Sequence, residues 1–312
     1  MNFKNCQLGE NSVKHILKQL ELNKSVKHAN FINCGLNDRS CIYLANTLKE
    51  NTHLKDLLLD NNKIKDEGII VLSSFLKHNS TLRNFSINEN YMRDSFIIFI
   101  GNLVKKQDSS IEILRIGNND IGSLSIKALS MSLNSISNIT ELDLEGTKFN
   151  VSSMSRFLLV MASNKTIRNL SLKSTFLNPS IERKAAKMLL VNKRLELFGI
   201  GNSKNIVERQ RWNDKYPFFN SNRIFDTLHY NSKINYVDVG YIKTTSRFIK
   251  KALKAVFIHE IGKETTKTIC LNKCKIHTIE TKNLYAKFKR AKHYGFVEIP
   301  SFAGLALHNH FW

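Results

Sequence analysis

Residues 54–64, LKDLLLDNNKI, set a pattern that returns along the chain at a nearly constant spacing. The same order of apolar residues recurs in residues 82–92, LRNFSINENYM, in residues 111–121, IEILRIGNNDI, and in residues 139–149, ITELDLEGTKF. Between residues 26 and 195 the steps from one leading residue to the next are 28, 28, 29, 28, 28 and 28. A period of this length indicates a solenoid in which each repeat packs against its neighbours.

Within each repeat the hydrophobic periodicity changes once. The first part alternates apolar and polar residues, which is typical of a short strand. The second part places apolar residues four positions apart, as in Leu44 and Leu48 or Leu72 and Leu76, and this spacing marks one face of a helix. The sequence therefore predicts an α/β fold, a right-handed solenoid of about eleven strand–helix repeats.

Asparagine occupies two fixed positions in the repeat. The first follows the strand and holds Asn62, Asn90 and Asn119, where a short polar side chain can satisfy backbone groups of a turn. The second lies where the helix ends, and we expect the left-handed conformation that asparagine tolerates there. The residues at this second position are Asn23, Asn51, Asn79, Asn164, Asn192 and Asn231.

Residues 1–302 resemble a leucine-rich repeat array of the ribonuclease-inhibitor-like class, on the motif LxxLxLxx(N/C/T)xL and the 28-residue period. The resemblance implies a horseshoe whose strands line the concave face. Members of that class inhibit ribonuclease, activate the Ran GTPase or sense ligands in cytosolic NOD-like receptors, and secreted effectors of intracellular bacteria also use it. The sequence has neither the long acidic tail of Ran GTPase activators nor a nucleotide-binding domain.

We expect a single leucine-rich repeat domain over residues 1–312. It comprises regular repeats in 1–203, irregular repeats with an eleven-residue insertion in 204–302, and a C-terminal cap in 303–312. Terminal repeats need a polar outer face, so the first helix, expected over 12–22, would cap the N-terminal edge. The alternative is that this edge pairs with another chain.

The composition limits the classes of protein to consider. Hydrophobic residues make up 42% of the chain, enough for a sizeable core. No apolar run approaches the ~18 residues of a membrane span, and the first residues lack a signal-peptide pattern. Five cysteines are a sparse and odd number that indicates a reducing compartment. We therefore expect a cytoplasmic protein, in the cytoplasm of a host cell if it is a secreted effector.

The positions between the strand leucines predict a partner-binding lane on the concave face. Equal positions of neighbouring repeats line up there, since adjacent strands are ~5 Å apart. Six acidic and two basic residues make the lane mildly acidic in a chain of net charge +21. Glu141, Asp143 and Glu145 would engage Lys or Arg of a protein partner and repel nucleic acid. The alternative is a solvated strand face. The candidate lane residues are Asp56, Asp60, Asn84, Asn88, Arg115, Glu141, Asp143, Glu145, Lys173, Tyr236 and Asp238.

Two further candidate surfaces follow residue 203. The insertion within residues 203–233 combines arginine with aromatic residues, as interface hot spots do, although these side chains could instead cover the stack. They are Arg211, Trp212, Tyr216, Phe218 and Phe219. Residues 243–292 hold 14 Lys and Arg against 3 Asp and Glu, and would contact anionic lipid or RNA. The candidates are Lys250, Lys251 and Lys254, and the alternative is an ordinary repeat helix with its lysines in water.

Signals for catalysis, metal binding and cofactor binding are weak. Residues 199–204, GIGNSK, fall on a repeat strand and lack the full spacing of a phosphate-binding loop. We expect a non-catalytic scaffold with no cofactor, metal or small-molecule substrate, which binds a protein across its concave face. One alternative is a small-GTPase regulator resembling the Ran activators, which would use Arg115 or Arg209. Another is a bacterial effector whose basic C-terminal region binds an anionic surface.

Overall fold

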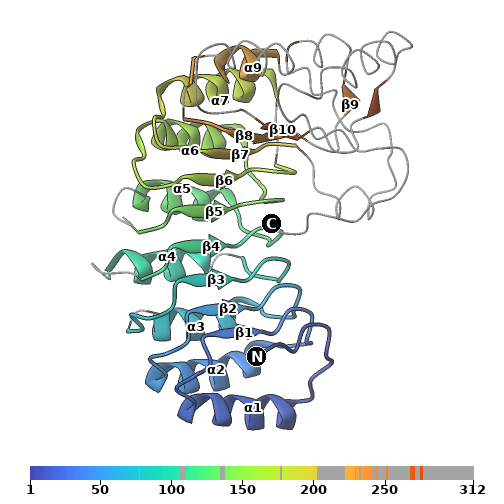
Figure 1. Ribbon diagram of the computed structural model, residues 1–312, viewed down its shortest axis with the longest axis vertical. Coiled ribbons are helices and arrows are strands. Elements are labelled where there is room, and N and C mark those ends of the chain that lie inside the picture. Colours follow the sequence, from blue (N-terminus) through green and yellow to red (C-terminus); the bar gives the residue numbers. More distant parts are fainter. Residues whose placement is uncertain are drawn as a thin grey trace.

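Strands and helices alternate along the chain and stack as a solenoid with the helices on one side of the sheet (Figure 1). The computed structural model describes residues 1–76, 78–93, 95–105, 110–133, 138–175 and 178–201. Beyond them it describes 222–228, 230–231, 233–239, 243–244, 251, 268–270 and 275–276. The predicted α/β leucine-rich repeat solenoid is confirmed. The assignment to the ribonuclease-inhibitor-like class and the single-domain boundaries stay predictions.

The main sheet is parallel, and its nine described strands follow the order of the chain. Each strand places its central apolar residue opposite the equivalent residue of the next repeat, as Leu57 lies opposite Phe85 and Leu114 opposite Leu142. The strands are β1 His28–Asn30, β2 Asp56–Leu58, β3 Asn84–Ser86, β4 Ile113–Arg115, β5 Glu141–Asp143, β6 Asn169–Ser171, β7 Leu197–Gly199, β8 Tyr236–Asp238 and β10 Thr268–Cys270. A separate pair joins β9, Lys243–Thr244, with β11, Lys275–Ile276.

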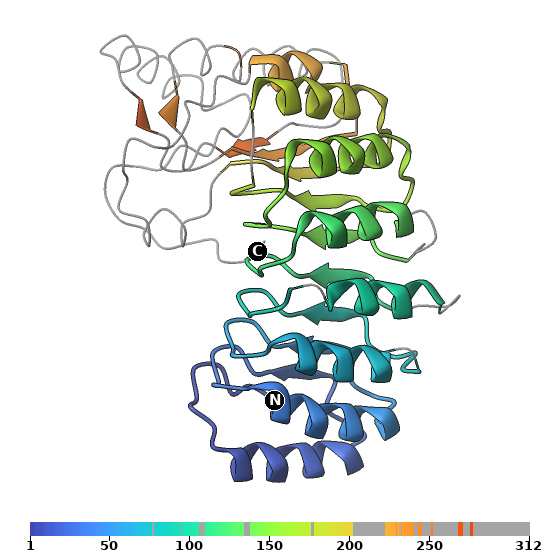
Figure 2. The same ribbon diagram turned by 180° about the vertical axis from the view of Figure 1, so that it is seen from behind.

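The helices all lie on the same face of this sheet (Figure 2). They are α1 Glu10–Leu22, α2 Asp38–Glu50, α3 Asp66–Leu76, α4 Phe96–Lys105, α5 Ser123–Ser132, α6 Val151–Ser163, α7 Pro179–Val191 and α9 Asn222–Leu228. Local sequence sets their starts: Asn37 and Asn150 cap α2 and α6 by accepting from the backbone N–H three residues on, and Pro179 begins α7. Among the described residues no helix is both long and apolar enough to cross a bilayer.

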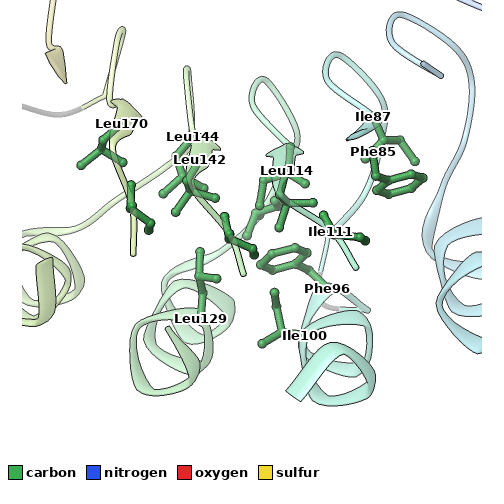
Figure 3. Close-up of a cluster of buried hydrophobic side chains, with 14 of the residues drawn as sticks. Phe85, Ile87, Phe96, Ile100, Ile111, Leu114, Leu129, Leu142, Leu144 and Leu170 are labelled. Carbon is green, nitrogen blue, oxygen red and sulfur yellow. The ribbon is translucent and has the colours of Figure 1, made fainter. Parts of the chain in front are cut away.

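The core lies between the sheet and the helices. Leu114 and Leu142 of the strands meet Phe96, Ile100 and Leu129 of the helices, and Figure 3 shows these side chains facing one another. All five are almost completely removed from solvent. Because every repeat contributes the same positions, this hydrophobic burial continues from one repeat to the next and stabilises the whole stack.

Asparagines after the strands join each repeat to its neighbour. Asn62 accepts the backbone N–H groups of Cys34 and Leu36 at 3.0 Å each. Its amide donates to the carbonyls of Phe31 at 2.9 Å and Leu59 at 2.8 Å. Asn90 and Asn119 make equivalent bonds one and two repeats further along. These buried amides therefore satisfy the turn backbone, as the sequence predicts.

The expectation of left-handed asparagines at the helix ends is wrong. Asn51 has φ −80° and ψ 115°, which is extended, and Asn23, Asn164 and Asn192 are extended too. The Asn51 oxygen accepts the backbone N–H groups at 53 and 54, and its amide reaches the carbonyl of Leu20 in the preceding helix at 2.8 Å. The hydrogen bond to the preceding repeat thus decides the extended conformation of Asn51.

Left-handed residues occur instead one position before the strand-following asparagines. Asn61 has φ 55° and Glu89 has φ 54°. In this conformation the N–H of Asn61 donates to the carbonyl of Asn88 at 2.9 Å, in the next repeat. The turn therefore continues the inter-repeat hydrogen bonds beyond the end of the strand.

The N-terminal edge is covered by α1, which begins two residues before the predicted cap. Val13, Leu17 and Leu20 bury their side chains, and the other side of α1 is mostly polar. Residues 1–3 run beside β1, where Phe3 N–H donates to the Asn30 carbonyl at 2.8 Å. The first repeat therefore presents a polar outer surface.

Candidate functional site: the strand face

The predicted lane residues come together on the strand face, but they bond to one another instead of standing in solvent. Each is buried or half-buried. Three groups make up the row: a pair at its beginning, a polar network over β2–β6, and an ion pair at its far end.

A chain of hydrogen bonds links β2 to β5. The Asp60 carboxylate accepts from Ser86 Oγ at 2.6 Å and from the backbone N–H of Asn88 at 2.7 Å. The Asn88 amide donates to Asp143 Oδ2 at 3.1 Å, and its oxygen accepts from the Gly117 N–H at 2.6 Å. Side chains up to three repeats apart are thereby held in one network.

Gly117 lies against the backbone of Glu145, next to this network. A Cβ at this position would lie 2.8 Å from the backbone oxygen of Glu145, closer than non-bonded atoms approach. Gly117 follows β4, and a glycine there allows the two backbones to approach closely.

Asp143 is more enclosed than the sequence suggests. It is 5% exposed, and its Oδ1 accepts from the backbone N–H of Glu145 at 2.9 Å. Loss of the Asp143 side chain would therefore break contacts in the interior of the row. Glu145 accepts from the Asn118 amide at 3.2 Å and keeps part of its side chain at the surface.

Burial raises the pKa of the two enclosed aspartates, Asp60 and Asp143. It raises the pKa of Asp60 to about 6, although the hydrogen bonds from Ser86 and Asn88 act in the opposite direction. Burial likewise raises the pKa of Asp143, against the hydrogen bonds from Glu145 N–H and the Asn88 amide. The Arg115 charge opposes both increases.

Arg115 and Glu141 form a second part of the network. Arg115 Nη2 lies 2.5 Å from Glu141 Oε1, and the two side chains are 23% and 15% exposed. Arg115 Nη1 also donates to the Asn84 side-chain oxygen at 3.4 Å. The Asn169 amide donates to Glu141 Oε2 at 3.4 Å. Arg115, one candidate for the GTPase-regulator alternative, thus has its guanidinium paired with Glu141, and the other candidate, Arg209, lies outside the described residues.

The two ends of the row carry further side-chain pairs. His28 Nδ1 contacts Asp56 Oδ2 at the N-terminal end. Lys173 Nζ lies 2.5 Å from Asp238 Oδ2 at the other end, and Tyr236 is half-buried on β8. Six acidic residues against Arg115 and Lys173 leave the row acidic overall.

Most of the other candidates lie outside the described residues. This holds for Arg211, Trp212, Tyr216, Phe218 and Phe219, and for Lys250 and Lys254. Lys251 is described, and its ammonium lies 2.6 Å from Asp226 Oδ2. Within the described part of the chain, no three His, Cys, Asp or Glu residues gather where they could hold a metal ion.

Sequence reasoning missed a basic surface on the other side of the sheet. Cations on α5–α7 point away from the core: Lys127, Arg156, Arg183, Lys184 and Lys187. The signal that could have found these cations is the net charge of each predicted helix, whereas the charge was summed over the irregular segment 243–292. It gives three cations on α7 against the single acid Glu182.

Comparison with known proteins leaves the family open. No protein-family model matches the chain, and no curated protein matches it. Similar solved structures include actin-binding site 2 of leiomodin-1, with 18% identity, 53% of this chain and 79% of that chain covered, and a TM-score of 0.34. The tropomodulin C-terminal domain of Caenorhabditis elegans is 18% identical, and the match covers 49% of this chain and 90% of that chain with a TM-score of 0.40. Likenesses of this size say nothing about what this chain binds.

Proposed function

We propose that this protein is a non-catalytic scaffold that binds a protein partner across its strand face. The observation that carries the proposal is the network over β2–β6, in which Asp60, Asn88 and Asp143 hold one another in place. Side chains fixed before binding lose little conformational entropy on binding. A row of such groups across several repeats suits recognition of an extended protein surface.

The charges of the row favour a basic partner. The row holds the six acids Asp56, Asp60, Glu141, Asp143, Glu145 and Asp238 against the two cations Arg115 and Lys173, which leaves an acidic surplus. Lys or Arg groups of a partner would be attracted to this surplus, which chiefly raises the association rate and the specificity. A polyanion would be repelled from the same face.

Photo-crosslinking locates the binding face directly. A photoreactive side chain at Asn84 or Asn169 reports the strand face, and one at Lys18 or Ser74 reports the helix side as the matched control. We expect partner crosslinks from Asn84 and Asn169. Crosslinks obtained only from Lys18 and Ser74 would place the partner on the helices and overturn the proposal.

A charge variant tests the acidic surplus. We expect Glu145→Gln to weaken capture of the crosslinked partner, because Gln keeps the size and acceptor oxygen of Glu but not its charge. The control is Glu67→Gln, which removes the same charge from an exposed position on α3. Glu141 is left intact, because its loss would leave Arg115 without its carboxylate. Asp143 is left intact, because its loss would remove the acceptor of the Asn88 amide and of the Glu145 N–H.

A further inference from the structure

The outward sides of α5, α6 and α7 share a composition. Outward positions on a helix recur three and four residues apart. On α5 they are Leu124, Lys127 and Met131; on α6, Arg156 and Leu159; on α7, Arg183, Lys187 and Leu190, with Lys184 beside them. Cations and long apolar side chains thus alternate over three neighbouring helices, drawn green to yellow-green in Figure 2.

The cations of this face carry uncompensated charge. Among the described residues, Lys127, Arg156, Arg183, Lys184 and Lys187 form no ion pair. Lys184 Nζ contacts the neutral hydroxyl of Ser155 at 2.5 Å, which leaves its charge intact. The single acid on the three helices, Glu182, accepts a hydrogen bond from the Arg223 N–H at 3.3 Å. The face therefore has a positive potential.

The apolar members of the face are large and open to solvent. Leu159 is 73% exposed, Leu124 71% and Met131 65%. Met131 and Leu159 occupy equal positions of consecutive repeats, so they lie on neighbouring helices at the same height, and Lys187 occupies that position in the next repeat. Exposed aliphatic groups ringed by cations are typical of a surface that enters the headgroup region of a membrane.

Helices α3 and α4 do not have this combination. The outward residues of α3 include Glu67, Ile70 and Ser74, and those of α4 include Ile97 and Ile98. These faces carry apolar groups with no described cation among them. Position in the stack alone does not explain the charge on α5–α7, because α3 and α4 have the same place in the repeat and no described cation on their outward faces.

We infer that the helix face of α5–α7 attaches the protein to an anionic lipid bilayer. The cations would lie over acidic headgroups while Leu124, Met131 and Leu159 enter the boundary with the acyl chains. Aliphatic side chains favour lipid over a nucleic-acid strand, whose bases stack on aromatic rings. This surface is made of residues on α5–α7 and not of residues 243–292. It lies on the opposite side of the sheet from the lane, so a bilayer there leaves the strand face open (Figure 1).

Vesicle binding by the full chain tests the charge requirement. The probe is vesicles of phosphatidylcholine with phosphatidylserine added, compared with phosphatidylcholine alone. We expect Arg183→Gln, Lys184→Gln and Lys187→Gln together to lower partitioning onto the anionic vesicles on the order of 100-fold, from about fivefold for each cation near the surface. The control is Lys18→Gln, Lys49→Gln and Lys63→Gln, three exposed lysines of the first repeats that give the same net charge. Equal partitioning of the two variants would overturn the inference.

A second variant separates a bilayer from other polyanions. Leu159→Ser with Met131→Ser removes apolar groups and no charge, so we expect about a tenfold loss on anionic vesicles. Retention on heparin should stay unchanged. Unaltered vesicle binding by this variant would mean that charge alone acts, and the bilayer would be the wrong ligand. Loss of vesicle binding in Lys250→Gln, Lys251→Gln and Lys254→Gln, without loss in the α7 variant, would place attachment on the C-terminal segment instead.

Discussion

Lys173 and Asp238 form an ion pair that spans an intervening repeat. Lys173 follows β6 and Asp238 ends β8, yet Nζ and Oδ2 are 2.5 Å apart and the two side chains are only 12% and 11% exposed. Gly199 of β7 lies between them, in register with Asp238. A Cβ on Gly199 would come within 3.2 Å of Lys173 Cε. The lysine therefore crosses β7 through the space that the glycine leaves.

Loss of the Lys173 charge should destabilise the fold. We expect Lys173→Met to lower the free energy of unfolding by about 3 kcal/mol, because the buried Asp238 carboxylate would lose the ammonium that lies 2.5 Å away. Adding Asp238→Asn should restore much of that loss, since the buried charge is then removed. Urea denaturation of the single and double variants measures both effects. Additive losses in the double variant would show that the pair contributes nothing.

Substitution of Thr147 should stabilise the protein. Thr147 takes the slot of Asn119 one repeat later, but its buried Oγ1 has no hydrogen-bond partner. Asn119 in that slot accepts from Met92 N–H and donates to the carbonyls of Ile87 and Ile116. We expect Thr147→Asn to raise the free energy of unfolding by about 1 kcal/mol, because the longer amide can make the equivalent bonds.

Asn119→Thr is the reciprocal change. It should lower the free energy of unfolding by about 1–3 kcal/mol, because it leaves buried backbone groups unpaired. Thermal melts of both variants beside the natural chain give the comparison. A lower melting temperature for Thr147→Asn would mean that the site lacks space for the amide.

Asp60 should make stability depend on pH. Its pKa is about 6 in the fold against 3.8 for the unfolded reference, so between these values the folded state binds more protons than the unfolded state. The free energy of unfolding should therefore fall as pH rises from about 4 to about 6, by about 3 kcal/mol for this group. The contribution of Asp143 has the same sign, because burial raises its pKa too.

Asp60→Asn isolates that contribution. The amide oxygen can still accept from Ser86 and Asn88, but it does not titrate. Urea midpoints across the same pH range should decline less steeply for the variant than for the natural chain. Identical slopes would assign the pH dependence to other groups.

The effect of a leucine substitution on stability should depend sharply on whether the side chain lies in the core or on the outer face of a helix. Leu142 is fully buried in the core, whereas Leu124 is 71% exposed on α5. We expect Leu142→Ala to cost about 2–5 kcal/mol, because it opens a cavity between sheet and helices. Leu124→Ala should change stability by at most about 0.5 kcal/mol. Chemical denaturation of the two variants provides the test, and similar losses would contradict the arrangement of the core.

The sequence by itself determined the repeat and its core. A period of 28 residues with Leu114, Leu142 and their equivalents at fixed places leaves one regular way to bury every apolar stripe, which is a stack of strand–helix units. The asparagines were also placed correctly, since turn backbone needs a short polar partner at the same point in every repeat. These features depend on local periodicity, which one chain displays directly.

Only the tertiary structure decided which polar groups meet. Asn88 bonds to Asp143 and Lys173 to Asp238 across distances of 55 and 65 residues in the chain, and the second contact depends on Gly199, which lets the lysine cross β7. The same holds for Asn51, whose extended backbone follows from its bond to the preceding helix rather than from the preference of asparagine for the left-handed conformation. Periodicity predicts which face a side chain occupies. The space and the partners on that face are set by neighbouring repeats, whose side chains meet only after the chain has folded.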